Sequence, residues 1–109
     1  MRESDLKSHI IELAKWQGWL IHHDLPALDS RGKWRTHIEG HAGFPDIVLA
    51  HPQGGLFLAE LKAETGRATL AQSKWLAAVE GHKAEAALWY PHDLKEIERR
   101  LTGRPAMAG

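Results

Sequence analysis

The sequence predicts an α/β fold in which a mixed central sheet is flanked by helices. Apolar residues recur at helical spacing in three segments, short apolar runs bounded by turn residues lie between them, and one helical segment connects two such runs. A helical crossover joins parallel strands and a tight turn joins antiparallel strands. The sheet is therefore expected to contain both kinds of pairing.

The first segments are expected to form a helix and a strand. A helix is predicted over residues 3–17, ended by Gly18, and a short strand over 19–24. The polar stretch that follows contains a turn at 29–32 and a weak strand at 34–39. The apolar stripe of the helix consists of Leu6, Ile10, Leu13 and Ala14.

Two short apolar runs on either side of a turn-forming segment are expected to form a β-hairpin. The runs cover 47–50 and 56–62, and residues 51–55, which contain proline and glycine, connect them. Both faces of the second run begin with apolar residues. This strand is therefore expected to be central and covered on both sides.

The remaining elements are predicted to be two helices with a strand between them. The second helix covers 69–80, because Thr69 and Gln72 have the spacing of a capping box. A strand over 84–90 and a last helix capped by Asp93 follow. The apolar face of the second helix comprises Ala71, Trp75, Ala78 and Val79, and that of the last helix comprises Leu94, Ile97 and Leu101.

Composition bounds the possible classes of protein. The 109 residues carry 14 basic and 14 acidic side chains and no cysteine, which argues against a strongly basic clamp and excludes disulfide-linked partners and thiolate metal sites. No apolar run is long enough for a membrane span or a signal peptide. We expect one cytosolic domain over 1–102 and a flexible tail over 103–109.

The end of the strand 56–62 carries the chemically informative residues. Side chains alternate between the faces of a strand, so Glu60 and Lys62 share one face with Leu56 and Leu58. A carboxylate and an amine in a partly buried position are costly unless they are paired or bind something. One interpretation is an ordinary ion pair at the rim of a surface hairpin.

The register of the hairpin favours a different interpretation. If the turn centres on Gln53, Ala50 faces Leu56 and Asp46 faces Glu60, with Cβ atoms about 4.5–5.5 Å apart. Two carboxylates at that distance repel each other, and a divalent cation between them reverses the sign of the interaction. Oxygen ligands suit Mg²⁺ or Mn²⁺ rather than zinc. A register shifted by one residue would separate the carboxylates.

These residues resemble a known nuclease signature. Gly43-Phe44-Pro45-Asp46, then thirteen residues, then Glu60-Leu61-Lys62 is similar to the PD-(D/E)xK pattern. The segment 66–72 with Trp75-Leu76 after it, and the later Leu88–Pro91 with Asp93-Leu94, resembles the virus-type replication-repair nuclease (VRR-NUC) family in its small, stand-alone, phage-like form. The resemblance implies a restriction-endonuclease-like core over nearly the whole chain.

The resemblance also implies an activity. Such a protein would be a Mg²⁺- or Mn²⁺-dependent endodeoxyribonuclease that hydrolyses phosphodiester bonds, often in branched DNA such as Holliday junctions. Symmetric cutting of a junction needs two sites, so a homodimer is expected from the family. The protein would be encoded by a phage or prophage and act in the cytoplasm of a bacterial host.

The roles implied by the resemblance fall on six residues. Asp46 and Glu60 would be metal ligands, together with the backbone carbonyl of Leu61, and Lys62 would position water or stabilise charge. Gln72 would face the same cleft, although capping the helix is the alternative. Glu3 would complete the metal shell, although a carboxylate in the first turn of a helix is favourable in itself. The stretch Ala68-Thr69-Leu70 departs from the family's more usual serine or proline there.

Aromatic and basic residues offer a candidate surface for nucleic acid. Trp34 lies between two basic residues in a polar segment, a composition that can stack on a base and hold phosphates, although packing of Trp34 on a loop is the alternative. The other four tryptophans lie beside apolar stripes and are expected in the core: Trp16, Trp19, Trp75 and Trp89. The predicted basic rim of the cleft comprises Arg31, Lys33, Arg35, Arg67 and Lys74.

Histidines and rival functions complete the hypotheses. His22-His23 with His37 and His41 could indicate zinc, but the last two lie in a predicted loop, and contact with a phosphate near Asp46 is the alternative.

Two rivals to the enzyme remain. One is a nuclease-like module that binds branched DNA without cutting it, and the other is an interaction domain with incidental carboxylates.

Overall fold

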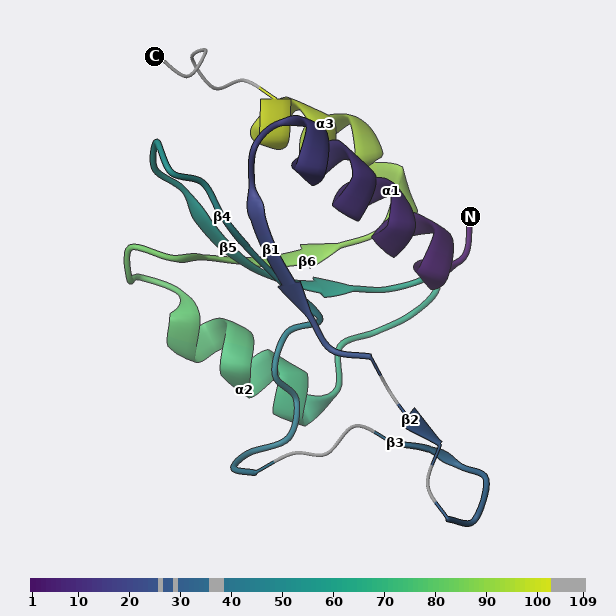
Figure 1. Cartoon of the computed structure of the whole chain (residues 1–109). Helices are drawn as coiled ribbons and strands as arrows, with labels where there is room; N and C mark the ends of the chain where they lie inside the picture. The colour runs from purple at the N-terminus through teal and green to yellow at the C-terminus, as the bar shows by residue number, and fades with distance from the viewer. Residues whose placement is uncertain (26, 29, 36–38, 103–109) are drawn as a thin grey trace.

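A four-stranded mixed sheet forms the centre of the computed structural model, which describes residues 1–25, 27–28, 30–35 and 39–102. The strand order is β1-β4-β5-β6, with α1 and α3 over one face and α2 over the other (Figure 1). This confirms the predicted α/β architecture. The strands are β1 (Leu20–His23), β4 (Ile47–Ala50), β5 (Leu56–Leu61) and β6 (Glu85–Trp89).

The pairing of the strands follows the predicted connections. β1 with β4 and β4 with β5 are antiparallel, and β5 with β6 is parallel, as the helical crossover through α2 requires. In the hairpin, Ile47 faces Ala59 and Ala50 faces Leu56, which is the predicted register. One further step along this register leads to Asp46 and Glu60.

The helices agree with the predictions apart from their ends. α1 covers Glu3–Trp16, α2 covers Leu70–Val79 with Thr69 as its N-cap, and α3 covers Leu94–Thr102. Asp93 lies in a short 3₁₀ turn, η1 (Pro91–Asp93), where its carboxylate accepts a hydrogen bond from the Tyr90 N–H at 3.0 Å. It therefore caps this turn rather than α3 itself. Within the described ranges no helix is long and apolar enough to cross a membrane.

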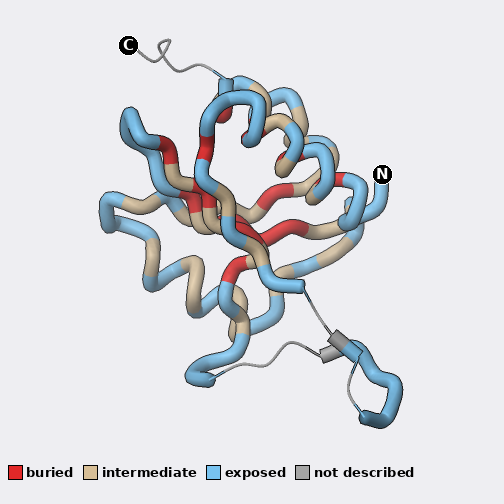
Figure 2. The backbone as a smooth tube through the Cα atoms, viewed as in Figure 1, coloured by how far each residue is buried: buried red, intermediate tan, exposed pale blue. Residues whose placement is uncertain are grey.

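The hydrophobic core lies between the sheet and the α1–α3 layer. Buried residues of the sheet and of both helices form one cluster. Figure 2 shows these buried stretches of the backbone in red. Leu13 is only partly buried at the edge of this core. The buried core residues are Leu6, Ile10, Ala14, Trp19, Ile47, Leu49, Phe57, Ala59, Leu61, Trp89, Ile97 and Leu101.

The predicted burial of the tryptophans is right for Trp19 and Trp89 and wrong for Trp16. Trp16 is 79% exposed and its indole N–H donates to Glu12 at 3.2 Å. It lies two residues beyond Ala14, about 200° around the helix from the buried stripe, so it points to solvent. Trp75, which was also expected in the core, is half-buried. None of the ten described residues of α2 is fully buried.

The polar stretch after β1 forms a second, small sheet. β2 (Ala27–Leu28), which the sequence did not predict, pairs antiparallel with β3 (Trp34–Arg35). This hairpin projects from the main sheet (Figure 1). β3 lies at the start of the predicted strand 34–39, and residues 36–38, like the predicted tail 103–109, lie outside the described residues.

Candidate active site

Asp46 and Glu60 lie side by side on the α2 face of the sheet. Glu60, in β5, is 1% exposed, and Asp46 lies half-buried immediately before β4. The Leu61 N–H donates to Asp46 Oδ2 at 3.0 Å, so the Asp46 carboxylate extends the β4–β5 ladder by one bond. The strand pairing that carries the core therefore also fixes the separation of the two acids.

The two oxygens of Glu60 have different surroundings. Gln72 Nε2 donates to Oε2 at 2.9 Å, and Lys62 Nζ lies 3.6 Å from the same oxygen. Oε1 is buried and has no hydrogen-bond partner within the part of the chain that the structure describes. Buried polar atoms are almost always satisfied in folded proteins, so this oxygen needs either a proton of its own or a cation.

The pKa of Glu60 reflects its burial and its charged neighbours. Burial first, and then repulsion from Asp46 and a hydrogen bond with it, raise the pKa of Glu60 to about 8, against the opposing effect of the Lys62 ammonium. Without a bound cation, Glu60 therefore holds a proton at neutral pH. A cation beside both acids would reverse the main electrostatic cause of this shift.

Gln72 combines its two predicted roles. Its side-chain oxygen accepts a hydrogen bond from the Thr69 N–H at 2.8 Å, and the Thr69 hydroxyl accepts from the Gln72 N–H at 3.1 Å, which is the predicted capping box. The same amide donates its N–H to Glu60. The cap thus holds the amide in the orientation that the carboxylate needs.

The donor set fits a hard divalent cation. The unpartnered oxygen of Glu60 and the Asp46 carboxylate supply only oxygen atoms, which suit Mg²⁺ or Mn²⁺. Over the described ranges, no three His, Cys, Asp or Glu side chains gather into a group that could hold a metal. Glu3, exposed in the first turn of α1, acts on Glu60 only through its charge, as the smallest cause that raises the pKa of Glu60.

The predicted nucleic-acid residues occupy two separate places. Arg31, Lys33 and Trp34 belong to the projecting β2–β3 hairpin, where Trp34 is 69% exposed. Arg67 and Lys74 are exposed before and on α2. Arg35 forms the last residue of β3. Of the two histidines considered for contact with a phosphate, His41 is exposed in the loop before Asp46 and His37 lies outside the described residues.

Gly43 is a residue whose role the sequence reasoning missed. Its φ is +93°, and a Cβ at this position would lie 2.5 Å from the carbonyl carbon of Ala71 and 2.7 Å from the Gln72 nitrogen. The loop before Asp46 thus touches the backbone of α2 directly. Glycine before a Pro-Asp pair is the sequence signal, and the need for close backbone approach explains it.

We expect Gly43→Ala to lower the free energy of unfolding by about 3 kcal/mol, because the positive φ and the overlap with α2 both disfavour a Cβ. Gly54→Ala is the matched control, since Gly54 has a φ of +106° and nothing within 4 Å. Gly54→Ala should lower the free energy of unfolding by about 1 kcal/mol, because only the positive φ disfavours a Cβ there. Urea denaturation of both variants measures the difference, and equal losses would contradict the contact with α2.

The fold and these side chains define a nuclease core: a mixed sheet with an acid before one strand and an E-x-K sequence at the end of the next. The family model of the VRR-NUC domain matches residues 21–93, about two thirds of the chain. The chain therefore belongs to the VRR-NUC family, which implies nuclease activity and DNA as its partner. No curated protein and no solved structure matches it. The matched segment contains the acids, Lys62 and Gln72 but not Glu3.

Proposed function

We propose that this protein is a metal-dependent DNA endonuclease whose active centre lies in a domain spanning residues 1–102. The observation that supports this most is the buried Glu60, which lies beside a second acid and has one oxygen without a partner. A purely structural role does not explain such a group, because burial of two neighbouring acids destabilises the fold.

Mg²⁺ or Mn²⁺ would be held by the carboxylates of Asp46 and Glu60 and by the backbone carbonyl of Leu61. When bound, the ion would acidify a water molecule and neutralise charge on the scissile phosphate. Glu3, at the start of α1, is proposed as an additional acid on this side of the cleft.

Lys62 and Gln72 have different proposed roles. The Lys62 side chain is 15% exposed, and its amine lies next to Glu60, where it would bind a phosphate oxygen and stabilise the negative charge that develops on hydrolysis. Gln72 would not touch the phosphate. It acts as a positioning residue, because its amide directs one oxygen of Glu60 toward α2 and leaves the other available.

The substrate is proposed to be branched DNA, cut by a homodimer. The resemblance to junction-cutting members of the family supports both parts. The projecting hairpin, with its exposed Trp34, and the two basic side chains near α2 would hold the arms of the DNA. The basic residues of the hairpin are Arg31, Lys33 and Arg35, and those near α2 are Arg67 and Lys74.

A panel of labelled DNA molecules tests this function. We expect the protein to cut four-way or flap DNA in Mg²⁺ or Mn²⁺, to cut linear duplex at least about 10-fold more slowly, and to cut nothing in EDTA. Cleavage at the same rate in EDTA would contradict the metal site. DNA that is shifted in a gel but remains uncut with either ion would favour the non-cleaving DNA-binding module.

A further inference from the structure

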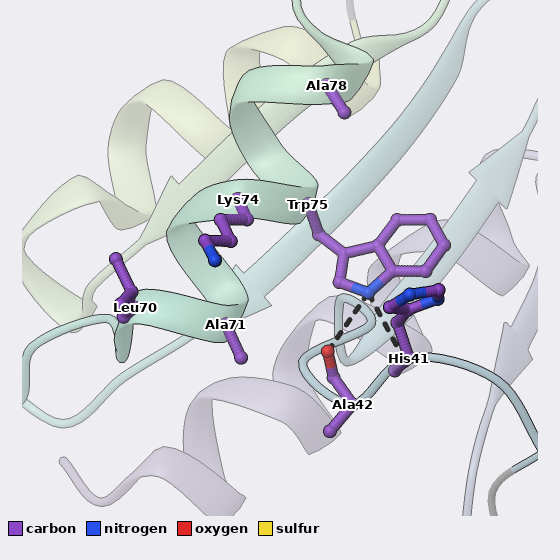
Figure 3. A pocket seen from close by; sticks show the side chains of 7 residues that line it. All are labelled: His41, Ala42, Leu70, Ala71, Lys74, Trp75 and Ala78. Carbon is purple, nitrogen blue, oxygen red and sulfur yellow. Dashed lines mark hydrogen bonds between the residues drawn. The ribbon is translucent and has the colours of Figure 1, made fainter.

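A groove along the outer side of α2 has no role in the proposed chemistry. Its volume is about 600 Å³, and it lies between α2 and the loop that leads to Asp46 (Figure 3). It is formed by apolar residues on the outer side of α2, a helix with no buried residue in the described part of the chain. The lining residues are His41, Ala42, Leu70, Ala71, Lys74, Trp75 and Ala78.

The aromatic side of the groove is rigid. The Trp75 indole N–H donates to the carbonyl oxygen of Ala42 at 3.1 Å, and the Phe44 ring packs edge-on against the indole with centroids 5.0 Å apart. These contacts fix the indole ring and satisfy its only polar group. In Figure 3 the His41 imidazole lies next to the indole, while Lys74 and Leu70 project from α2 on the other side.

The chemistry of this lining matches an unpaired nucleotide. A fixed aromatic ring with small alanine side chains beside it accepts the flat face of a base, and the exposed amine of Lys74 can bind the attached phosphate. The volume lies in the range of small-ligand sites, about 300–1,000 Å³.

The groove lies close to the candidate active site along the chain. Ala42 precedes Asp46 by four residues, a chain distance of at most about 14 Å, and Ala71 adjoins Gln72, which contacts Glu60. A DNA strand rises about 3.4 Å per stacked nucleotide. A base in the groove would therefore lie within about four nucleotides of a phosphate at the acids.

We propose that this groove binds one unpaired nucleotide of the DNA substrate close to the scissile phosphate. The inference rests on the proposed function, because it takes DNA as the substrate of the neighbouring acids. It adds a specificity determinant: DNA with an unpaired base near the cut binds more tightly than fully paired DNA of the same sequence.

Filling the groove tests this inference. Ala78→Leu adds bulk at an exposed lining position, and Ala77→Leu makes the same change at an exposed position of α2 that does not line the groove. Binding is measured in EDTA with a duplex carrying one unpaired 2-aminopurine and with its paired counterpart. We expect the wild-type chain and Ala77→Leu to prefer the unpaired base by about 10-fold or more and to change its fluorescence. Ala78→Leu should lose both effects.

Other results would overturn the inference. If Ala77→Leu and Ala78→Leu prefer the duplex with the unpaired base equally, no base lies in the groove. The same follows if the wild-type chain binds both duplexes equally. A change in dimerisation of Ala78→Leu without a change in DNA preference would mean that a second copy of the chain occupies it. Because this assay needs no cleavage, its failure is distinct from failure of the proposed nuclease, which full cleavage by Asp46→Ala would show.

Discussion

Asp46→Ala and Glu60→Gln are each expected to lower the rate of DNA cleavage in Mg²⁺ by about 10³-fold or more. Both carboxylates would contact the ion in the proposed site, so each substitution removes one ligand of that ion. Initial rates on labelled four-way DNA, at saturating protein, measure the effect on the chemical step.

Matched controls separate this effect from general charge loss. Glu80→Gln removes an exposed carboxylate at the far end of α2 and should leave the rate within about 2-fold of wild type. Lys62→Ala should reduce the rate by about 10²-fold and Lys95→Ala, an exposed position on α3, should not. Cleavage at the wild-type rate by Asp46→Ala or Glu60→Gln would refute the proposed active centre.

The arrangement of the two acids could be predicted because it depends on few choices. Apolar alternation fixes which face each residue of β5 takes, and the length of the 51–55 turn fixes the register against β4. These two rules place Asp46 opposite Glu60 without any knowledge of the rest of the fold. The contact between Gln72 and Glu60 also follows once the crossover helix is placed over the same face.

Other features depend on the three-dimensional arrangement of the chain, which sequence patterns do not contain. Trp16 was expected in the core because it adjoins an apolar stripe, yet its angular position on α1 turns it to solvent. The two residues that the structure describes in β2, Ala27 and Leu28, are too few to show an alternation. The groove beside Trp75 is bounded by the loop that touches α2 at Gly43, a property of three-dimensional packing alone.

The same buried acid that is proposed to bind the ion should destabilise the protein when no ion is present. The pKa of Glu60 is about 8 in the folded protein and near its ordinary value of 4.5 in the unfolded chain. Between these values the folded state keeps a proton that the unfolded state has released. The free energy of unfolding therefore falls as the pH rises from about 4.5 to about 8, and the loss is complete above that range.

Glu60→Gln should remove this loss, because an amide does not titrate and still accepts the hydrogen bond from Gln72. In EDTA at pH 9, we expect the variant to be more stable than wild type by on the order of 2–4 kcal/mol, and at pH 4.5 by little. Urea denaturation across this pH range measures both curves, with Glu80→Gln as the control whose curve should follow wild type. Parallel curves for wild type and Glu60→Gln would contradict the raised pKa. A variant that is more stable and inactive would mean that the acids at positions 46 and 60 are retained for chemistry at the expense of the fold.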